Sequence, residues 1–115
     1  MGINKYGNEK INVDGLTFDS KAESRRYKEL KLLESAGEIK SLQLQPKFEL
    51  VEKTKGERDV TYIAYFMYLE KPKEPLAVWQ VVAEDVKDVK TKDYIIKRKL
   101  LKARYTHIDF RELEV

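Results

Sequence analysis

Three ionisable residues, Glu23, Asp85 and Lys87, stand where the surrounding sequence pattern favours apolar side chains. At 100° per residue, Glu23 lies on the same helical stripe as Tyr27 and Leu30. Asp85 and Lys87 are two residues apart, so in a strand they point to one face, at the end of an apolar run. Charges on buried faces are costly unless they have partners. Because the chain has no Cys and one His, any bound metal must be a hard ion such as Mg²⁺ held by oxygen ligands.

Each of these charges also has a purely structural explanation. Ser20 and Glu23 have the spacing of a capping box at the start of a helix. Glu23 can instead pair with Arg26, three residues further on. Asp85 and Lys87 can pair with each other or end in solvent. These explanations stay open at the level of sequence.

The charge of the chain is concentrated in one segment. Between Lys87 and Arg104 there are eight basic and two acidic residues, whereas the net charge of the whole chain is +3. A basic segment on a slightly acidic body suits a polyanion better than an anionic membrane, although a solvated helix face also explains it. No apolar run approaches the roughly 18 residues of a membrane span, and no signal peptide is found. We therefore expect a cytoplasmic protein with no membrane partner and, lacking Cys, no disulfide or zinc finger.

The pattern predicts one α/β domain over residues 1–115, with a flexible basic arm at 1–10. The strand expected at 76–87 is largely apolar and should be central in its sheet. The helices and strands together give a core of the order α-β-β-β-α-β. The expected elements are a hairpin of 11–13 and 16–18 around Asp14-Gly15, a helix from Ser20 to about Ala36, a strand over 42–51 broken at Pro46, a strand over 60–69, a strand over 76–87, a helix from Thr91 to about Arg104, and a strand over 107–113.

The combined pattern resembles the PD-(D/E)XK nuclease superfamily. More closely, the chain is similar to a phage-encoded family within it, described as of unknown function or as junction-resolvase-like. The segments that carry this resemblance are NKYGN (4–8), VDGLTFDSKAESRRY (13–27), LQPKFEL (44–50), TYIAYF (61–66), EDVK (84–87) and TKDYIIKRKLL (91–101).

The resemblance implies a restriction-endonuclease-like fold, with a mixed central sheet flanked by helices, and a metal-dependent nuclease site. It assigns the metal ion, Mg²⁺ or Mn²⁺, to the carboxylates of Glu23 and Asp85 and to the carbonyl of Val86. It assigns to Lys87 the orientation of the nucleophile or the compensation of developing charge. In this chemistry the metal polarises the scissile phosphate and lowers the pKa of a bound water.

Position 65 departs from the family pattern, because Tyr65 stands where an Asp is expected. A neutral phenol is a poor Mg²⁺ ligand, so the metal is expected to bind weakly or not at all. Glu84 lies on the other face of its strand, and Asp59 is too far upstream to replace the missing carboxylate. Asp88 could approach only from a loop. Tyr65 is alternatively a core residue or a DNA-stacking residue, beside Tyr62, Phe66 and Tyr68.

We expect a phage-type, Mg²⁺-dependent DNA endonuclease, with branched DNA as a candidate substrate and a homodimer as a candidate state. No nucleotide cofactor is expected. In the second helix, Lys92, Lys99 and Lys102 should face DNA phosphates beside an inward arc of Ile96, Leu100 and Ala103. The full set of expected DNA-binding residues is Lys90, Lys92, Lys99, Lys102 and Arg25. The alternatives are an inactive family member that binds DNA without cutting it, and a phage protein that binds a host protein.

Overall fold

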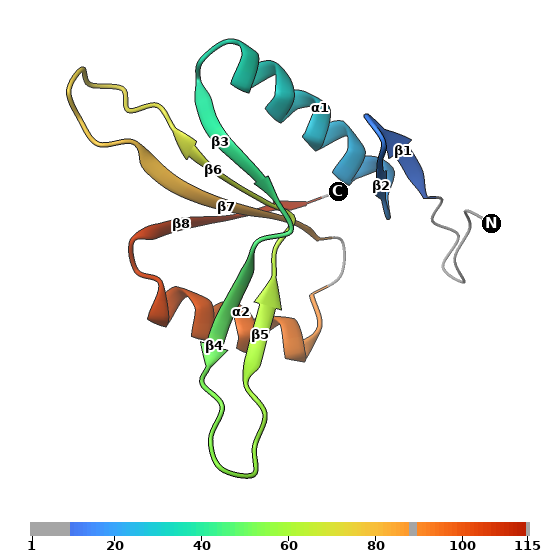
Figure 1. Cartoon of the computed structure of the whole chain (residues 1–115), viewed down its shortest axis with the longest axis vertical. Helices are drawn as coiled ribbons and strands as arrows, with labels where there is room; N and C mark the ends of the chain where they lie inside the picture. The colour runs from blue at the N-terminus through green and yellow to red at the C-terminus, as the bar shows by residue number, and fades with distance from the viewer. Residues whose placement is uncertain (1–9, 88–89, 115) are drawn as a thin grey trace.

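The computed structural model describes residues 10–87 and 90–114, with only the main chain described for Lys87 and Glu114. The arm expected at 1–10 falls almost wholly outside this part of the chain. The described residues measure 48 × 39 × 23 Å along their principal axes. They form two helices and eight short strands, connected in the order drawn in Figure 1.

The N-terminal hairpin and the first helix form as the sequence predicts. Strand β1 (Ile11–Val13) pairs antiparallel with β2 (Leu16–Phe18). Asp14 and Gly15 between them have φ angles of 53° and 77°, the left-handed values that a two-residue hairpin turn needs. Helix α1 (Lys21–Ser35) begins after Ser20, whose side chain caps it, and Gly37 beyond its end has a φ of 79°.

The central sheet is mixed, as expected, and has the strand order β3-β6-β7-β8. Its members are β3 (Ile39–Leu44), β6 (Phe66–Glu70), β7 (Gln80–Lys87) and β8 (Ile108–Glu114). Strands β3, β6 and β7 are antiparallel neighbours, whereas β8 is parallel to β7 and follows it through helix α2 (Lys92–Arg104). The fold is therefore mixed α/β with a helix-flanked sheet, compatible with a restriction-endonuclease-like core.

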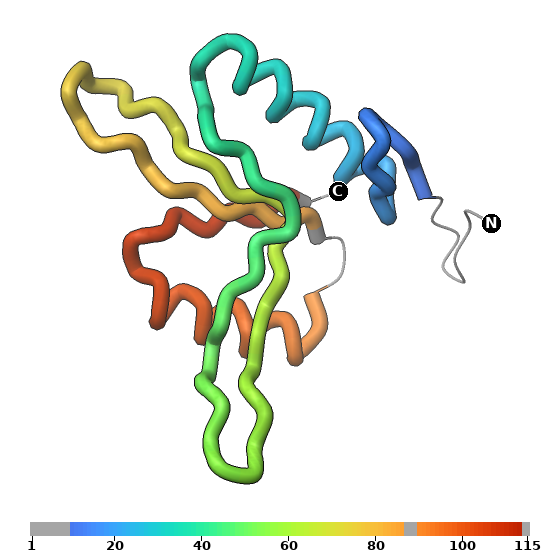
Figure 2. Tube along the Cα trace, viewed as in Figure 1, coloured from blue at the N-terminus to red at the C-terminus, as the bar shows by residue number. Residues whose placement is uncertain are grey.

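Two of the expected strands bend out of the central sheet halfway along. The strand expected over 60–69 is two strands, β5 (Val60–Ile63) and β6, because the chain leaves the ladder at Ala64 and Tyr65. Strand β4 (Lys47–Val51) likewise follows β3 after Pro46, which lacks an N–H, and pairs with β5 in a separate ribbon. Figure 2 shows the β3–β4 and β5–β6 segments of the chain crossing together from the sheet into the ribbon. We call residues 44–46 and 64–66 the strand junction.

Strand β7 is central, as predicted, but it begins at Gln80 and not at Leu76. Leu76 follows Pro75 and has a φ of 71°, which a continuing strand cannot use. Leu76 and Val78 are fully or almost fully exposed. The apolar character of 76–79 therefore belongs to a loop and not to the strand.

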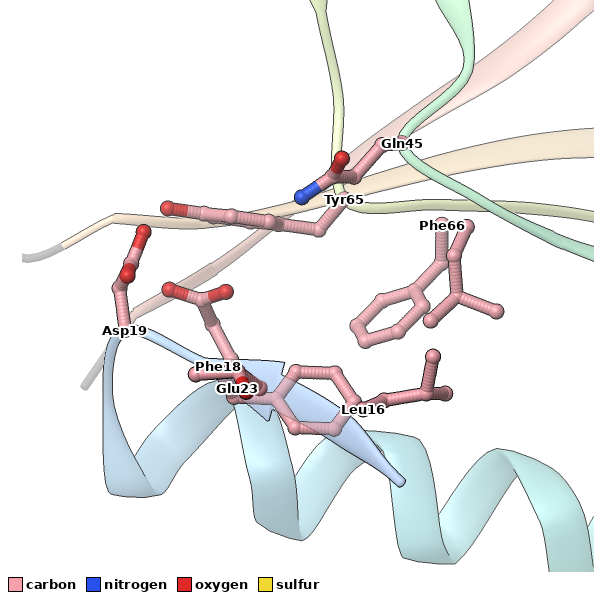
Figure 3. Close-up of a pocket in the computed structure, with 9 residues that line it drawn as sticks. Leu16, Phe18, Asp19, Glu23, Gln45, Tyr65 and Phe66 are labelled. Carbon is pink, nitrogen blue, oxygen red and sulfur yellow. The ribbon is translucent and has the colours of Figure 1, made fainter. Parts of the chain in front are cut away.

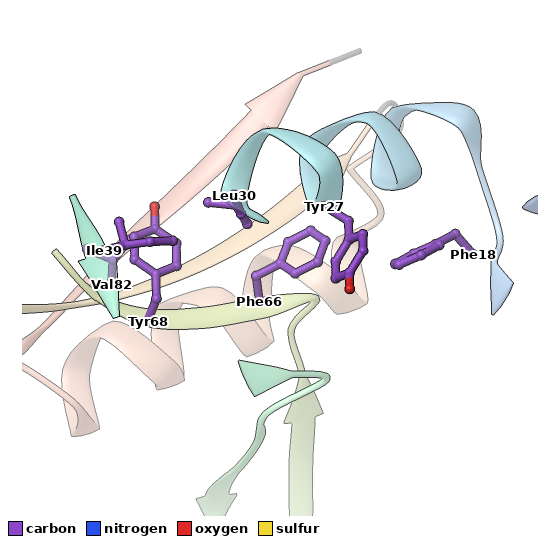
Figure 4. Packing of buried hydrophobic residues seen from close by; sticks show 7 residues of the cluster. All are labelled: Phe18, Tyr27, Leu30, Ile39, Phe66, Tyr68 and Val82. Atoms are coloured by element: carbon purple, nitrogen blue, oxygen red, sulfur yellow. The ribbon is translucent and has the colours of Figure 1, made fainter. Parts of the chain in front are cut away.

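The two helices cover opposite faces of the sheet. Tyr27 and Leu30 of α1 pack with Phe18, Phe66, Tyr68 and Val82, as Figure 4 shows. Tyr94 and Leu101 of α2 pack on the other face, with Ala83 and with residues of the β4–β5 ribbon. The inward arc expected for the second helix is right for Leu100, which packs against the core, and wrong for Ile96, which is 59% exposed, and for Ala103, which is also exposed. Tyr94, Arg98 and Leu101 turn toward the sheet instead.

Each helix is fixed to the sheet by a glutamate that binds an arginine and a tyrosine. Glu84 of β7 is fully buried and accepts hydrogen bonds from Arg26 Nε and Nη2 at 2.8 and 2.7 Å. The hydroxyl of Tyr68 donates to the same carboxylate. On the other face, Glu112 of β8 accepts from Tyr94 and Arg98 at 2.6 and 2.7 Å. These bonds set the position of each helix along the strands.

The variant Arg26→Leu should destabilise the protein by about 3 kcal/mol, because it leaves the buried Glu84 carboxylate without its cation. The matched control is Arg25→Leu, one residue earlier on the exposed face of the same helix. It should change the free energy of unfolding by roughly 0.5 kcal/mol or less. Urea denaturation measures both. Equal stability of the two variants would contradict the assigned role of the Arg26–Glu84 pair.

Candidate functional site

The candidate acids meet at the strand junction, where α1 begins and β7 nears its end. Glu23 lies in the first turn of α1, and Tyr65 lies between β5 and β6. In the β6–β7 register, Phe66 pairs with Glu84, so one further step sets Tyr65 beside Asp85. The Tyr65 N–H donates to the Glu84 carbonyl at 3.1 Å. Position 65 therefore sits between the two candidate metal ligands.

Glu23 is 5% exposed and is held by two hydroxyl groups. Ser20 Oγ accepts from the Glu23 N–H at 3.1 Å and donates to the Glu23 carboxylate at 3.3 Å. Ser20 therefore caps the helix as predicted, and the Glu23 carboxylate bonds back to the Ser20 hydroxyl. The Tyr65 hydroxyl also donates to the carboxylate. Burial raises the pKa of Glu23, and the charges of Asp19 and Asp85 add to the rise, while the two hydrogen bonds oppose it.

The alternative pairing of Glu23 with Arg26 is wrong. Arg26 is committed to Glu84 and also lies 3.9 Å from Glu29. The negative charge of Glu23 is therefore stabilised by hydroxyl groups rather than by this cation. The neighbouring carboxylates increase the electrostatic cost of keeping Glu23 ionised.

Asp85 is 1% exposed and lies on the β7 face opposite Glu84, as the alternation of the strand predicts. Its Oδ1 accepts a hydrogen bond from the Val86 N–H at 3.1 Å. The Asp85 charge also contributes to the raised pKa of Tyr94, behind burial and the bond to Glu112. Lys87 continues β7, but its side chain lies outside the described part of the chain, as does Asp88.

The donor set has the chemistry of a hard-cation site, but it is one carboxylate short. Glu23, Asp85 and the Val86 carbonyl offer only oxygen atoms, which suits Mg²⁺ or Mn²⁺. Within residues 10–87 and 90–114, no three Asp, Glu, His or Cys side chains converge as a metal-binding group. Tyr65 explains the shortfall, because its phenol is hydrogen-bonded to Glu23 at the position where an Asp is expected. The residues present therefore fit a weakly held ion.

A pocket of about 230 Å³ opens beside this site. One wall comes from β2 and the start of α1, with Leu16, Phe18, Asp19 and Glu23, and the other comes from the strand junction. Figure 3 shows the Tyr65 hydroxyl on the same side as the Asp19 and Glu23 carboxylates. Asp19 was missed by the sequence reasoning, which began the first helix at Ser20. Asp19 lies before the helix cap, so no helical spacing marks it, and the folded hairpin brings it to the pocket.

The expected DNA-binding residues do not form one continuous surface. Lys90 and Lys92 lie between the end of β7 and the first turn of α2, and Lys99 and Lys102 follow along the exposed side of α2. Arg25 lies on α1, which covers the opposite face of the sheet. Other cations of the segment are engaged internally, with Lys97 bonded to Asp93, Arg98 to Glu112, and Arg104 to Glu49 and Glu52. One DNA duplex lying along α2 therefore misses Arg25.

The variant Tyr65→Phe should raise the pKa of Glu23 further, because it removes a hydrogen bond that favours the ionised carboxylate. The control is Tyr105→Phe, which removes a hydroxyl bonded to the Glu49 carbonyl at 2.9 Å and touches no carboxylate. Carbon-13 NMR titration of the Glu23 side chain reports both. An unchanged Glu23 pKa in Tyr65→Phe would contradict the described contact.

The raised pKa of Glu23 also gives the pH dependence of stability a sign. The folded protein binds this proton more tightly than the unfolded chain does. The protonation of Glu23 therefore adds its full contribution to the free energy of unfolding below the ordinary carboxyl pKa. This contribution is lost as pH rises through the pKa of folded Glu23. Glu23→Gln should remove this component when unfolding free energies are measured across that window. The same slope in Glu23→Gln and the parent protein would contradict the assignment.

Comparison with known proteins places the chain in a family and goes no further. No helix within the described residues is long and apolar enough to span a membrane. Searches of curated proteins and of solved structures give no match. A family model, described as a protein of unknown function (DUF1064), matches residues 3–113. Since that match covers nearly the whole sequence, the chain belongs to the DUF1064 family.

Proposed function

We propose that the protein is a phage-type, metal-dependent DNA endonuclease with weakened metal binding. The observation that carries this proposal is the meeting of Glu23, position 65 and Asp85 at the strand junction. These are the three positions that the sequence resemblance assigns to metal-holding acids. Its site of action is the cytoplasm of a bacterial host.

One end of the molecule has the charge distribution that a DNA backbone requires. Both helices begin at the end where β7 finishes, as Figure 1 shows. Helix N-termini carry positive partial charge, and Lys90 and Lys92 add two cations beside the second of them. This arrangement supports a phosphodiester substrate.

The chain's own residues have separate roles in this proposal. Glu23, Asp85 and the Val86 carbonyl would hold Mg²⁺ or Mn²⁺, and Lys87 would orient the attacking water or offset charge on the phosphate. When bound, the metal ion polarises the phosphate and lowers the pKa of water. Arg26 keeps α1, and with it Glu23, in register with β7 through Glu84. The Tyr65 hydroxyl is hydrogen-bonded to the Glu23 carboxylate and would compete with the metal ion for that ligand.

A second candidate function is DNA binding without cleavage. The observation that favours it is the same hydrogen bond from Tyr65 to Glu23. A phenol that stays on this carboxylate leaves fewer charged ligands for a divalent ion. The two candidates differ in the behaviour of the parent protein, and they agree on the effect of restoring an acid.

The variant Tyr65→Asp should cleave DNA in Mg²⁺ or Mn²⁺ at least tenfold faster than the parent protein, because it completes a three-carboxylate donor set. The double variant Tyr65→Asp/Asp85→Asn is the control and should be inactive. Duplex, four-way-junction and single-stranded DNA serve as substrates. Slow, metal-dependent cleavage by the parent supports the endonuclease, and cleavage only after Tyr65→Asp supports the binding protein. Inactivity of Tyr65→Asp on all three substrates would refute the nuclease proposal.

The double variant Lys90→Glu/Lys92→Glu should weaken DNA binding and reduce the salt dependence of its affinity, by about one unit of slope for each phosphate that is no longer neutralised. The control, Lys71→Glu/Lys73→Glu, makes the same charge change in the exposed β6–β7 connection. Fluorescence anisotropy at several salt concentrations measures both. Equal weakening by the two pairs would contradict a DNA surface at the end of β7. No salt-dependent binding at all would favour a protein partner.

A homodimer would bring two such sites to the two strands of a branched DNA. This part of the proposal is tested by sedimentation of the protein alone and with a four-way junction. Two protomers on each junction would support it, and a single protomer on each would count against it.

A further inference from the structure

The pocket beside Glu23 combines an aromatic interior with a polar rim. Tyr65 contributes the partly exposed ring, whereas Phe18 from β2 and Phe66 from β6 are 5% and 1% exposed and form the floor of the pocket. Asp19, Glu23 and the amide of Gln45 supply the polar groups. Protein sites for small planar molecules have this composition, with mostly apolar walls and a few placed polar groups.

The size of the pocket limits what it can hold. Its volume of about 230 Å³ equals that of roughly eight water molecules in the liquid. One heterocyclic base with its exocyclic groups fits this space, and a base pair does not. Aromatic side chains stack on bases of every sequence, typically for about 1–3 kcal/mol per base. The occupant of matching shape is therefore a single unpaired base.

The polar groups distinguish among the bases. Asp19 and Glu23 present carboxylate oxygens, which accept hydrogen bonds. Adenine, cytosine and guanine carry an exocyclic amino group that can donate to them. Thymine has no amino group, and its single N3–H donor lies between two carbonyl oxygens that the same carboxylates repel. A carboxylate rim therefore favours the amino-bearing bases.

Gln45 is placed to contribute both a donor and an acceptor. Its backbone has a φ of 53°, an uncommon conformation for a residue other than glycine. The Gln45 N–H holds this conformation by donating to the Tyr65 carbonyl at 2.9 Å. Figure 3 shows its amide beside the Tyr65 ring, at the rim of the pocket. An amide in this position can pair with a base edge through two hydrogen bonds.

We propose that this pocket receives one unpaired base of the DNA substrate and prefers adenine, cytosine or guanine to thymine. The proposal rests on the proposed DNA function and specifies its substrate, because bases of an intact duplex are stacked and paired and cannot enter. Branch points and bulges supply bases that are already free. The pocket lies beside the candidate acids, so an inserted base brings its own phosphate toward them.

The first test uses uncharged nucleosides, which report on the pocket independently of phosphate binding. Adenosine and cytidine should shift the NMR methyl signals of Leu16 and Leu44, which line the pocket. Thymidine should shift them less, and the exposed Leu32 should not respond. Gln45→Ala should lower the affinity about tenfold, the effect of removing one side chain that pairs with a base edge. The matched control is Gln43→Ala, two residues earlier in the sequence and outside the pocket lining, and it should bind like the parent.

The second test uses duplexes that carry one bulged adenine or one bulged thymine, with the fully paired duplex as reference. The bulged adenine should bind several-fold more tightly than the thymine, and Gln45→Ala should abolish the preference while Gln43→Ala keeps it. Equal binding of all three duplexes, together with unshifted Leu16 and Leu44 signals, would overturn the base pocket and leave the DNA function standing. Nucleoside binding without binding of any oligonucleotide would overturn the DNA function instead.

Discussion

The buried contact between Glu84, Arg26 and Tyr68 is the interaction on which the candidate site depends. Glu84 lies next to Asp85 in β7, and Arg26 lies one helical turn after Glu23 in α1. The two hydrogen bonds between them therefore fix the distance between the two candidate acids. Burial and the bond to Glu84 raise the pKa of Tyr68, so its hydroxyl remains a donor at neutral pH. A structural ion pair on one face of β7 thus positions both candidate acids, Asp85 on the other face and Glu23 at the start of α1.

The side chain of Tyr65 sets how many charged ligands the candidate site can offer. The fold brings position 65 to Glu23 and beside Asp85, and the side chain there is a hydrogen-bond donor instead of an anion. Its hydroxyl stabilises the ionised form of Glu23, which burial and the nearby carboxylates destabilise. The same ring borders the pocket that we assign to an unpaired base. In the two proposals, Tyr65 therefore links metal affinity and base binding in one side chain, at the junction where the strands divide.

The sequence predicted most elements, because their signals are local. Ser20, Thr91 and Asp14-Gly15 act on their own neighbours and form the caps and the turn expected of them. The division of the 60–69 strand at Ala64–Tyr65 was missed, since nothing in that apolar run marks a change of sheet. Ile96 was misplaced because the orientation of α2 depends on the distant Glu112. Glu23 and Asp85 were identified as unusual by pattern alone, whereas Asp19 required the folded hairpin.

The most direct test of the account is a crystal structure in Mn²⁺, with the ion located by its anomalous scattering, for the parent protein and for Tyr65→Asp. The account predicts an ion bound by Glu23, Asp85 and the Val86 carbonyl at full occupancy in Tyr65→Asp, and at lower occupancy in the parent. It also predicts that Tyr65 leaves the Glu23 carboxylate wherever the ion is bound. An empty site in both proteins at saturating Mn²⁺ would contradict the central claim that these acids form a metal-dependent nuclease site.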